Sequence, residues 1–142
     1  MKTISFSPPD ITEAEIKEVA EALRSGWITT GPRTKKLEKE IANYCGTNKV
    51  VCLNSATASL ELNLRVLGIG PGDEVITSAY TYTASASVID HIGAKIVLID
   101  TAAGSYEMDY EKLESVITER TKAIIPVDLA GIPCNYSKIY EI

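Results

Sequence analysis

The sequence contains few cysteines, and those present form no recognisable pattern. The chain has three cysteines, Cys45, Cys52 and Cys134, which is an odd number, and they lack the paired spacing of metal ligands. Cys52 also lies inside an apolar run, where a reduced thiol acts as a small packing residue. The cysteines therefore predict no metal site, and they are typical of reduced thiols in a cytoplasmic protein.

Basic clusters, an export signal and long apolar runs are also absent. The net charge is −5, and the densest basic group, within residues 35–40, alternates with glutamates as on a solvated helix face. A nucleic-acid-binding surface requires clustered positive charge, so this class of function is disfavoured. Residues 1–6 lack the apolar stretch of a signal peptide, and no segment reaches membrane-spanning length. We expect a cytoplasmic protein with neither a membrane nor a nucleic-acid partner.

The residues that are present suffice for one domain with a core, because 45% of the 142 are hydrophobic and 23% are charged. Two helices are predicted near the start of the chain. Thr12 and Glu15 have the spacing of a capping box, and Ser25-Gly26 ends the first helix. Pro32 suits the first turn of a second helix, which ends at Gly46.

From residue 49 onward, strand and helix patterns alternate. Strand-like apolar runs cover residues 49–53, 74–77, 95–99 and 122–127, and helix-like segments follow at 58–67, 83–92, 110–117 and beyond Asn135. This order predicts a three-layer α/β fold with a mainly parallel sheet and flanking helices. We expect residues 49–142 to form an incomplete α/β domain, in one structural unit with an arm and two helices over residues 1–48.

A polar turn of small residues, 54–59, joins the first predicted strand to its helix. Backbone N–H groups at a helix start favour an anion, so the turn is a candidate phosphate cradle. An ordinary capped helix is the alternative, and the six residues alone favour it. In open α/β sheets, ligands bind beyond the carboxyl ends of strands, where Tyr82 also falls. A cradle beside an aromatic ring suits a phosphorylated aromatic cofactor. The alternative for Tyr82 is a packing residue, which would be favoured without the neighbouring cradle.

Four segments in this order resemble the DegT/StrS family of pyridoxal-phosphate (PLP)-dependent sugar aminotransferases, in particular the branch that makes 4-amino-4-deoxy-arabinose on a UDP carrier. They are residues 25–32 (SGWITTGP), 54–58 (NSATA), 72–77 (GDEVIT) and 118–127 (TERTKAIIPV). The resemblance covers essentially the whole chain as the N-terminal portion of such an enzyme. It implies part of the large PLP-binding domain of the aspartate-aminotransferase fold, and dimers whose active sites lie between subunits.

The resemblance also implies roles for particular residues around the cofactor. Thr57 and Ala58 would hold the PLP phosphate through backbone and hydroxyl donors, and Ser55 and Ala56 would shape the turn. Tyr82 stands at the position of the aromatic residue that stacks on the pyridine ring. These implied roles agree with the cradle and the ring expected from the residues alone.

A second set of implied contacts concerns the substrate. The loop that carries Trp27, Thr29, Thr30 and Gly31 would lie near the nucleotide-sugar site. From the residues alone, Trp27 is either part of a binding edge or an anchor that fixes the N-terminal helix to the core. Asp128 stands where the family more commonly has His, so the local substrate contacts are expected to differ.

Two groups that a PLP aminotransferase requires are expected downstream of residue 142: the Schiff-base lysine and the carboxylate that pairs with the pyridinium nitrogen. No lysine present has the family's Ser-x-His-x-x-Lys context. We therefore assign no catalytic residue, and we expect the chain alone to be inactive and to bind PLP weakly or not at all. The intact enzyme would transfer an amino group, from glutamate, to a keto-sugar nucleotide in polysaccharide or amino-sugar biosynthesis. The alternative is a non-catalytic binding or regulatory half-domain that self-associates or pairs with another chain.

Overall fold

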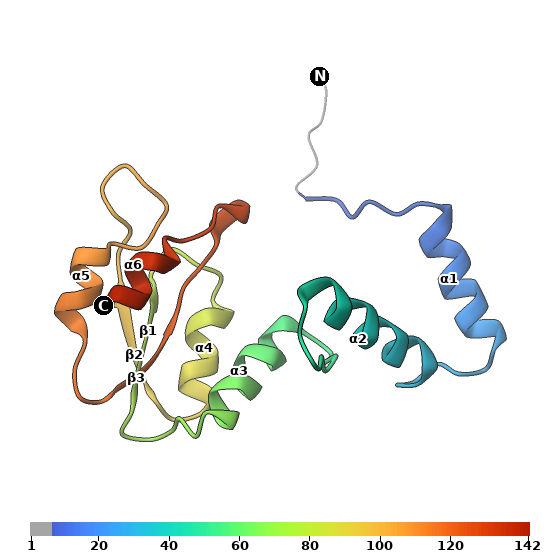
Figure 1. The fold of residues 1–142 in the computed structure, drawn as a ribbon, viewed down its shortest axis with the longest axis horizontal. Helices are drawn as coiled ribbons and strands as arrows, with labels where there is room; N and C mark the ends of the chain where they lie inside the picture. The colour runs from blue at the N-terminus through green and yellow to red at the C-terminus, as the bar shows by residue number, and fades with distance from the viewer. Residues whose placement is uncertain (1–6) are drawn as a thin grey trace. The chain divides into compact units, whose positions relative to one another are not determined.

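A computed structural model describes residues 7–142, and these residues divide into two compact units (Figure 1). The first ends at Cys52 and contains α1 (Glu13–Arg24) and α2 (Pro32–Cys45). The second begins at Leu53 and contains the sheet.

The two helices of the first unit begin and end where the sequence predicts. At the start of α1, the backbone N–H of Thr12 donates to Glu15 Oε2 at 2.6 Å, and Thr12 Oγ1 accepts from the N–H of Ala14 at 3.2 Å. The predicted capping box is therefore confirmed. Gly46 ends α2 in the left-handed conformation, at φ 65°. The apolar stripe of α1 is not buried, because all its large members are more than half exposed: Ile16, Val19 and Leu23.

The second unit is a three-stranded parallel sheet between two layers of helices. Its elements are α3 (Ala56–Val66), β1 (Glu74–Ser78), α4 (Ala84–His91), β2 (Lys95–Ile99), α5 (Tyr110–Val116), β3 (Thr121–Ile125), a 3₁₀ turn (Leu129–Gly131) and α6 (Tyr136–Glu141). The strand order is β2-β1-β3, and both pairings are parallel. Helices α3 and α4 lie on one face of the sheet, and α5 and α6 lie on the other (Figure 1). The predicted three-layer α/β fold is confirmed.

The central strand β1 is buried along its whole length and supplies both halves of the core. Its side chains alternate between the two faces of the sheet. Val75 packs with Leu64 of α3 and with residues of α4. Ile76, on the opposite face, packs in a cluster completed by Ile99, Met108 and Leu113. Each helical layer is therefore fixed to the sheet through a neighbouring residue of the same strand.

The prediction of a strand over residues 49–53 is wrong for the structure described. Both edges of β1 are already occupied, by β2 and by β3, and residues 49–53 join no ladder. The backbone N–H of Cys52 instead donates to Glu38 Oε1 at 3.0 Å. An apolar run indicates that a segment tends to be buried, but a strand also requires a neighbour that supplies hydrogen bonds.

A buried carboxylate joins the starts of the three strands. Glu74 has a side chain only 2% exposed, and it accepts from Lys95 Nζ at 2.9 Å, from Arg120 at 2.8 Å and from Thr118 Oγ1 at 2.8 Å. Lys95 begins β2, and Thr118 and Arg120 precede β3. The bonds from Lys95 and Thr118 hold the pKa of Glu74 below its ordinary value of 4.5. The ionised carboxylate therefore stabilises the strand register.

The described residues form neither a membrane-spanning helix nor a metal site. Among residues 7–142, the helices are all too short or too polar to cross a bilayer. The same residues contain no group of three His, Cys, Asp or Glu side chains arranged to hold a metal ion.

We predict that Glu74→Gln lowers the urea midpoint of unfolding at pH 7, because it removes an ionised acceptor with three donors. A carboxylate with a depressed pKa stabilises the fold above its unfolded pKa, and this contribution is lost as the pH falls through the folded value. The difference in midpoint between wild type and variant should therefore shrink below about pH 4.5. Denaturation curves at pH 7, 5 and 3 check this, with the exposed Glu114→Gln as a control. An equal difference at all three pH values would contradict it.

We also predict that Leu113→Ala destabilises the second unit by about 2–5 kcal/mol, because Leu113 is fully buried and its truncation leaves a cavity beside Ile76 and Met108. Leu67→Ala removes the same atoms from a side chain that is 69% exposed. That control should cost about 0.5 kcal/mol or less. Urea denaturation followed by far-ultraviolet circular dichroism measures both, and similar losses for the two variants would show that the α5 face is not a packed core.

Candidate functional site

The polar turn forms the start of α3 and leaves hydrogen-bond donors unused. Ser55 is the N-cap, and its Oγ accepts from the N–H of Ala58 at 3.1 Å. The first bond of the helix ladder runs from the Ser59 N–H to the Ser55 carbonyl at 3.2 Å. Since the first N–H groups of a helix have no intrahelical acceptor, the N–H groups of Ala56 and Thr57 remain available. The turn is therefore an ordinary helix cap, and the helix start it caps still has free N–H donors that favour an anion.

This geometry refines the roles expected for the small residues. The N–H of Ala58, expected to contact a phosphate, already donates to Ser55, so a phosphate would share or replace that bond. The N–H groups of Ala56 and Thr57 precede it in the same turn. The hydroxyl of Thr57 lies on the first turn of α3, and its side chain is partly exposed. The donors best placed for an anion are therefore one residue earlier than the sequence suggested.

Tyr82 lies at the carboxyl edge of the sheet, in the loop between β1 and α4. Its residue is 82% exposed, and its carbonyl accepts from the Ser85 N–H at 3.0 Å. The preceding Thr81 Oγ1 shares a 2.8 Å hydrogen bond with Ser85 Oγ. Its ring therefore does not pack into the core of the described unit. A free ring on a fixed backbone is what stacking on a ligand requires.

Helices α3 and α4 run in the same direction. Glu61 and Arg65 of α3 both reach the last residue of α4, since Glu61 Oε2 lies 3.0 Å from His91 Nδ1 and Arg65 lies 3.4 Å from the His91 carbonyl. The starts of the two helices therefore face the same side of the unit, the side of the strand carboxyl ends. Within residues 7–142, no hydrogen bond joins residues 54–59 to the Tyr82 loop.

The structure also shows tyrosine contacts at this edge that the sequence did not suggest. The rings of Tyr80 and Tyr106 stack with centroids 5.7 Å apart and an interplanar angle of 22°. Tyr106 belongs to the loop after β2 and Tyr80 to the loop after β1. Their separation of 26 positions follows no local periodicity, so only the parallel pairing of the two strands brings them together.

Asp128, which follows β3, is hydrogen-bonded to other residues of the same loop and of α6. Its carboxylate accepts from the Cys134 N–H at 2.9 Å and from the Tyr136 hydroxyl at 3.0 Å. These two bonds, the backbone bond first, lower the pKa of Asp128. They close a turn in which Ala130 adopts a positive φ of 53°. In this structure Asp128 holds a loop rather than pointing to a free ligand position.

The Trp27 loop lies in the first unit and closes on itself. Trp27 Nε1 donates to the Thr30 carbonyl at 3.1 Å, and the indole covers Gly31. A Cβ atom on Gly31 would overlap the indole ring, so only glycine fits beneath Trp27 in this conformation. Trp27 and Thr29 line a hollow of about 210 Å³ in the same unit. The tryptophan is 57% exposed, which agrees better with a surface role than with a core anchor.

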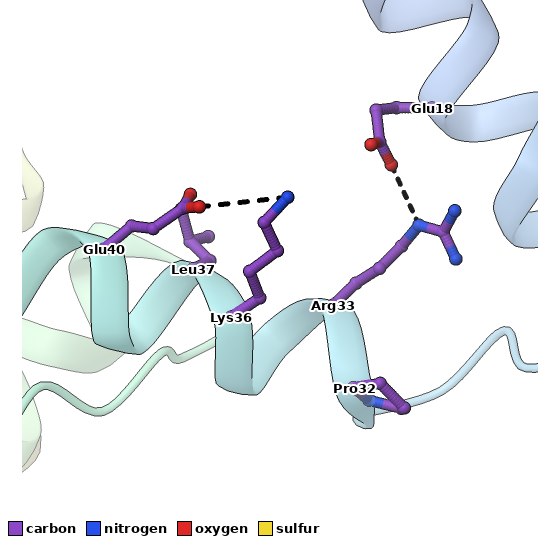
Figure 2. A pocket seen from close by; sticks show the side chains of 6 residues that line it. All are labelled: Glu18, Pro32, Arg33, Lys36, Leu37 and Glu40. Carbon is purple, nitrogen blue, oxygen red and sulfur yellow. Dashed lines mark hydrogen bonds and ion pairs between the residues drawn. The ribbon is translucent and has the colours of Figure 1, made fainter.

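A larger hollow of about 470 Å³ lies along α1 and α2, and Figure 2 shows the side chains around it. Arg33 Nε lies 2.9 Å from Glu18 Oε2, and Lys36 Nζ lies 3.8 Å from Glu40 Oε1. The other two lining residues are Pro32 and Leu37. Every charged side chain in the hollow is thus paired with an opposite charge (Figure 2), which leaves it without a recognition group for a charged ligand.

Known proteins resemble both the sequence and this geometry. The chain is 48% identical over 134 residues to the UDP-4-amino-4-deoxy-L-arabinose–oxoglutarate aminotransferase of Shewanella sediminis, covering 94% of this chain and 34% of that protein. It is 43% identical over 139 residues to the spore coat polysaccharide biosynthesis protein SpsC of Bacillus subtilis, covering 98% and 36%. The chain therefore spans about a third of the length of the curated relatives it matches.

Solved structures also resemble this chain. A Streptococcus pneumoniae protein described as a sugar aminotransferase, Spr1654, matches in its PMP-form with a TM-score of 0.95 and 63% identity, over 99% of this chain and 36% of that one. Its PLP-form matches with a TM-score of 0.94. The predicted fold, part of the large domain of the aspartate-aminotransferase-like fold, is confirmed. Residues 9–142 match the profile of the DegT/DnrJ/EryC1/StrS aminotransferase family, and the chain belongs to this family.

Proposed function

We propose that this chain is the cofactor-anchoring N-terminal part of a PLP-dependent nucleotide-sugar aminotransferase. The intact enzyme would act in the cytoplasm as a dimer and transfer an amino group, from glutamate, to a keto-sugar nucleotide. The family match over residues 9–142 supports the reaction class. The relatives named for UDP-4-amino-4-deoxy-L-arabinose and for spore coat polysaccharide support the sugar substrate.

The observation that carries the proposal is the first turn of α3. Unused N–H groups on Ala56 and Thr57, with the Thr57 hydroxyl, begin an 11-residue helix whose dipole favours a phosphate. Tyr82 adds an exposed ring on the same side of the unit. These residues fit the phosphate and the pyridine ring of PLP. When bound, PLP supplies an electron sink for carbanion chemistry. The chain's own part is to bind and orient it.

The Trp27 loop is proposed to lie near the nucleotide-sugar site of the intact enzyme. Its fixed indole offers an exposed face, and Thr29 and Thr30 offer hydroxyls and backbone groups beside it. The close contact between Trp27 and Gly31 holds this shape in the absence of a ligand.

We predict that the chain binds pyridoxamine 5′-phosphate more tightly than pyridoxamine, because the α3 terminus recognises the phosphate. Both ligands carry an amine in place of the aldehyde of PLP, so they do not condense with surface lysines. Thr57→Val keeps the side-chain shape and removes one hydroxyl donor, so it should weaken phosphate-ester binding about 10- to 160-fold, the loss of one hydrogen bond to a charged group. Ligand fluorescence titrations measure both affinities.

Thr83→Val is the matched control, since Thr83 is exposed and caps α4 without a side-chain hydrogen bond. It should leave both affinities unchanged. Equal affinities for the two ligands, or an unchanged affinity in Thr57→Val, would contradict a phosphate site at α3.

We further predict that the 142-residue chain has no transaminase activity, because none of its lysines lies in the family context required for covalent cofactor attachment. Borohydride reduction of a stoichiometric PLP mixture, followed by peptide mass mapping, should find no single lysine modified to near completion. One dominant site, together with amino transfer from glutamate, would overturn this. Scattered low-level labelling is the expected background.

A further inference from the structure

We propose that the stacked pair Tyr80 and Tyr106 is a positioning device that fixes the loop carrying Tyr82 and presents that ring to the cofactor. This inference rests on the proposed function, because it assigns the pair a role toward the PLP ring. Neither tyrosine belongs to the core of the described unit, since Tyr80 is 53% and Tyr106 63% exposed. Their stack is the contact between the loop tips that follow β1 and β2.

The Tyr106 side of the stack is rigidly supported. Residues 101–108 form a closed loop: Thr101 pairs with Met108 in an antiparallel bridge, and the Ala102 N–H donates to the Glu107 carbonyl at 3.0 Å. Met108 is 1% exposed and fixed in the α5 side of the core. Tyr106 is therefore carried on a short, anchored loop and can act as a fixed support.

The Tyr80 side is held by fewer contacts. The Ala79 N–H donates to the Ile99 carbonyl at 2.7 Å, which extends the β1–β2 pairing by one residue. The Tyr80 N–H donates to Ser78 Oγ at 3.2 Å. Beyond that point, Thr81 is bonded to Ser85, and Tyr82 exposes its ring. The aromatic stack on Tyr80 and the hydroxyl pair on Thr81 thus hold the backbone of Tyr82 from two sides.

This arrangement has an energetic consequence for binding. A ring that stacks on a ligand gives its full contribution only if its backbone is already ordered, since ordering on binding costs conformational entropy. Aromatic pairs contribute modestly beyond their buried area. Losing the Tyr80–Tyr106 stack should therefore weaken binding of the pyridine ring about two- to tenfold. It should leave binding of phosphate alone unchanged, because the α3 terminus is untouched.

Tyr106→Ala and Tyr106→Phe in the 142-residue chain separate the stack from the hydroxyl. We expect Tyr106→Ala to lower the {¹H}-¹⁵N heteronuclear NOE of residues 80–82 and to weaken pyridoxamine 5′-phosphate binding. Inorganic phosphate, followed by the amide shifts of Ala56 and Thr57, should bind both variants as it binds the wild type. Tyr106→Phe should keep the wild-type NOE and affinity. Tyr140→Ala, which removes a tyrosine that is 86% exposed on α6, is the control.

The possible results are distinguishable. If the wild type binds pyridoxamine 5′-phosphate and Tyr106→Ala shows the same affinity or the same loop NOE, this inference is overturned. The proposed function then stands. A parallel loss of inorganic phosphate binding shows general unfolding and overturns the positioning role. No binding of either ligand by the wild-type chain overturns this inference and the cofactor-anchoring role proposed for this chain, and it leaves the family membership untouched. A Tyr80→Ala/Tyr106→Ala double variant should bind no more weakly than either single variant, because both remove the same contact.

Discussion

The parallel pairing of β1 with a strand on each side is the constraint on which the second unit depends. It buries all five residues of β1, and it places three strand starts together around Glu74. It also brings the loops after β1, β2 and β3 to one edge of the unit. The charged cluster and the candidate site are thus opposite ends of the same sheet. One end fixes the register, and the other carries the loops that are proposed to face a ligand.

This polarity explains why the chemistry-bearing residues lie where they do. Glu74 is buried with three donors, an arrangement that stabilises a charge but leaves no open position for a ligand. At the carboxyl edge, the helix start at Ala56 and the ring of Tyr82 are open. A perturbed carboxylate would ordinarily suggest a functional site. Here the perturbation is structural, and the exposed groups at the other end of the sheet are the candidates for binding.

Much of this could be predicted from the sequence, because the signals are local. The capping box at Thr12, the alternation of strand and helix, and the small-residue turn before α3 each involve residues a few positions apart. The strand at residues 49–53 failed because pairing is a property of two segments, and the pattern describes only one. The Tyr80–Tyr106 stack and the Asp128–Tyr136 bonds were missed for the same reason. The stack arises from the register of the sheet, and the Asp128–Tyr136 bonds arise from the turn after β3; hydrophobic spacing encodes neither.

The two groups proposed to bind PLP, the start of α3 and Tyr82, lie close together along the chain. Between the start of α3 and Tyr82 the chain contains only the rest of α3, strand β1 and their turns. Each depends on contacts made inside the second unit: Ser55 caps α3, and Thr81, Ser85 and Tyr106 hold the loops. The residues proposed for phosphate recognition and for ring stacking are thus both held in place by contacts within this unit. The resemblance assigns covalent attachment and pyridinium pairing to later segments. On the proposed function, binding of the cofactor and its activation would thus fall to different stretches of the polypeptide.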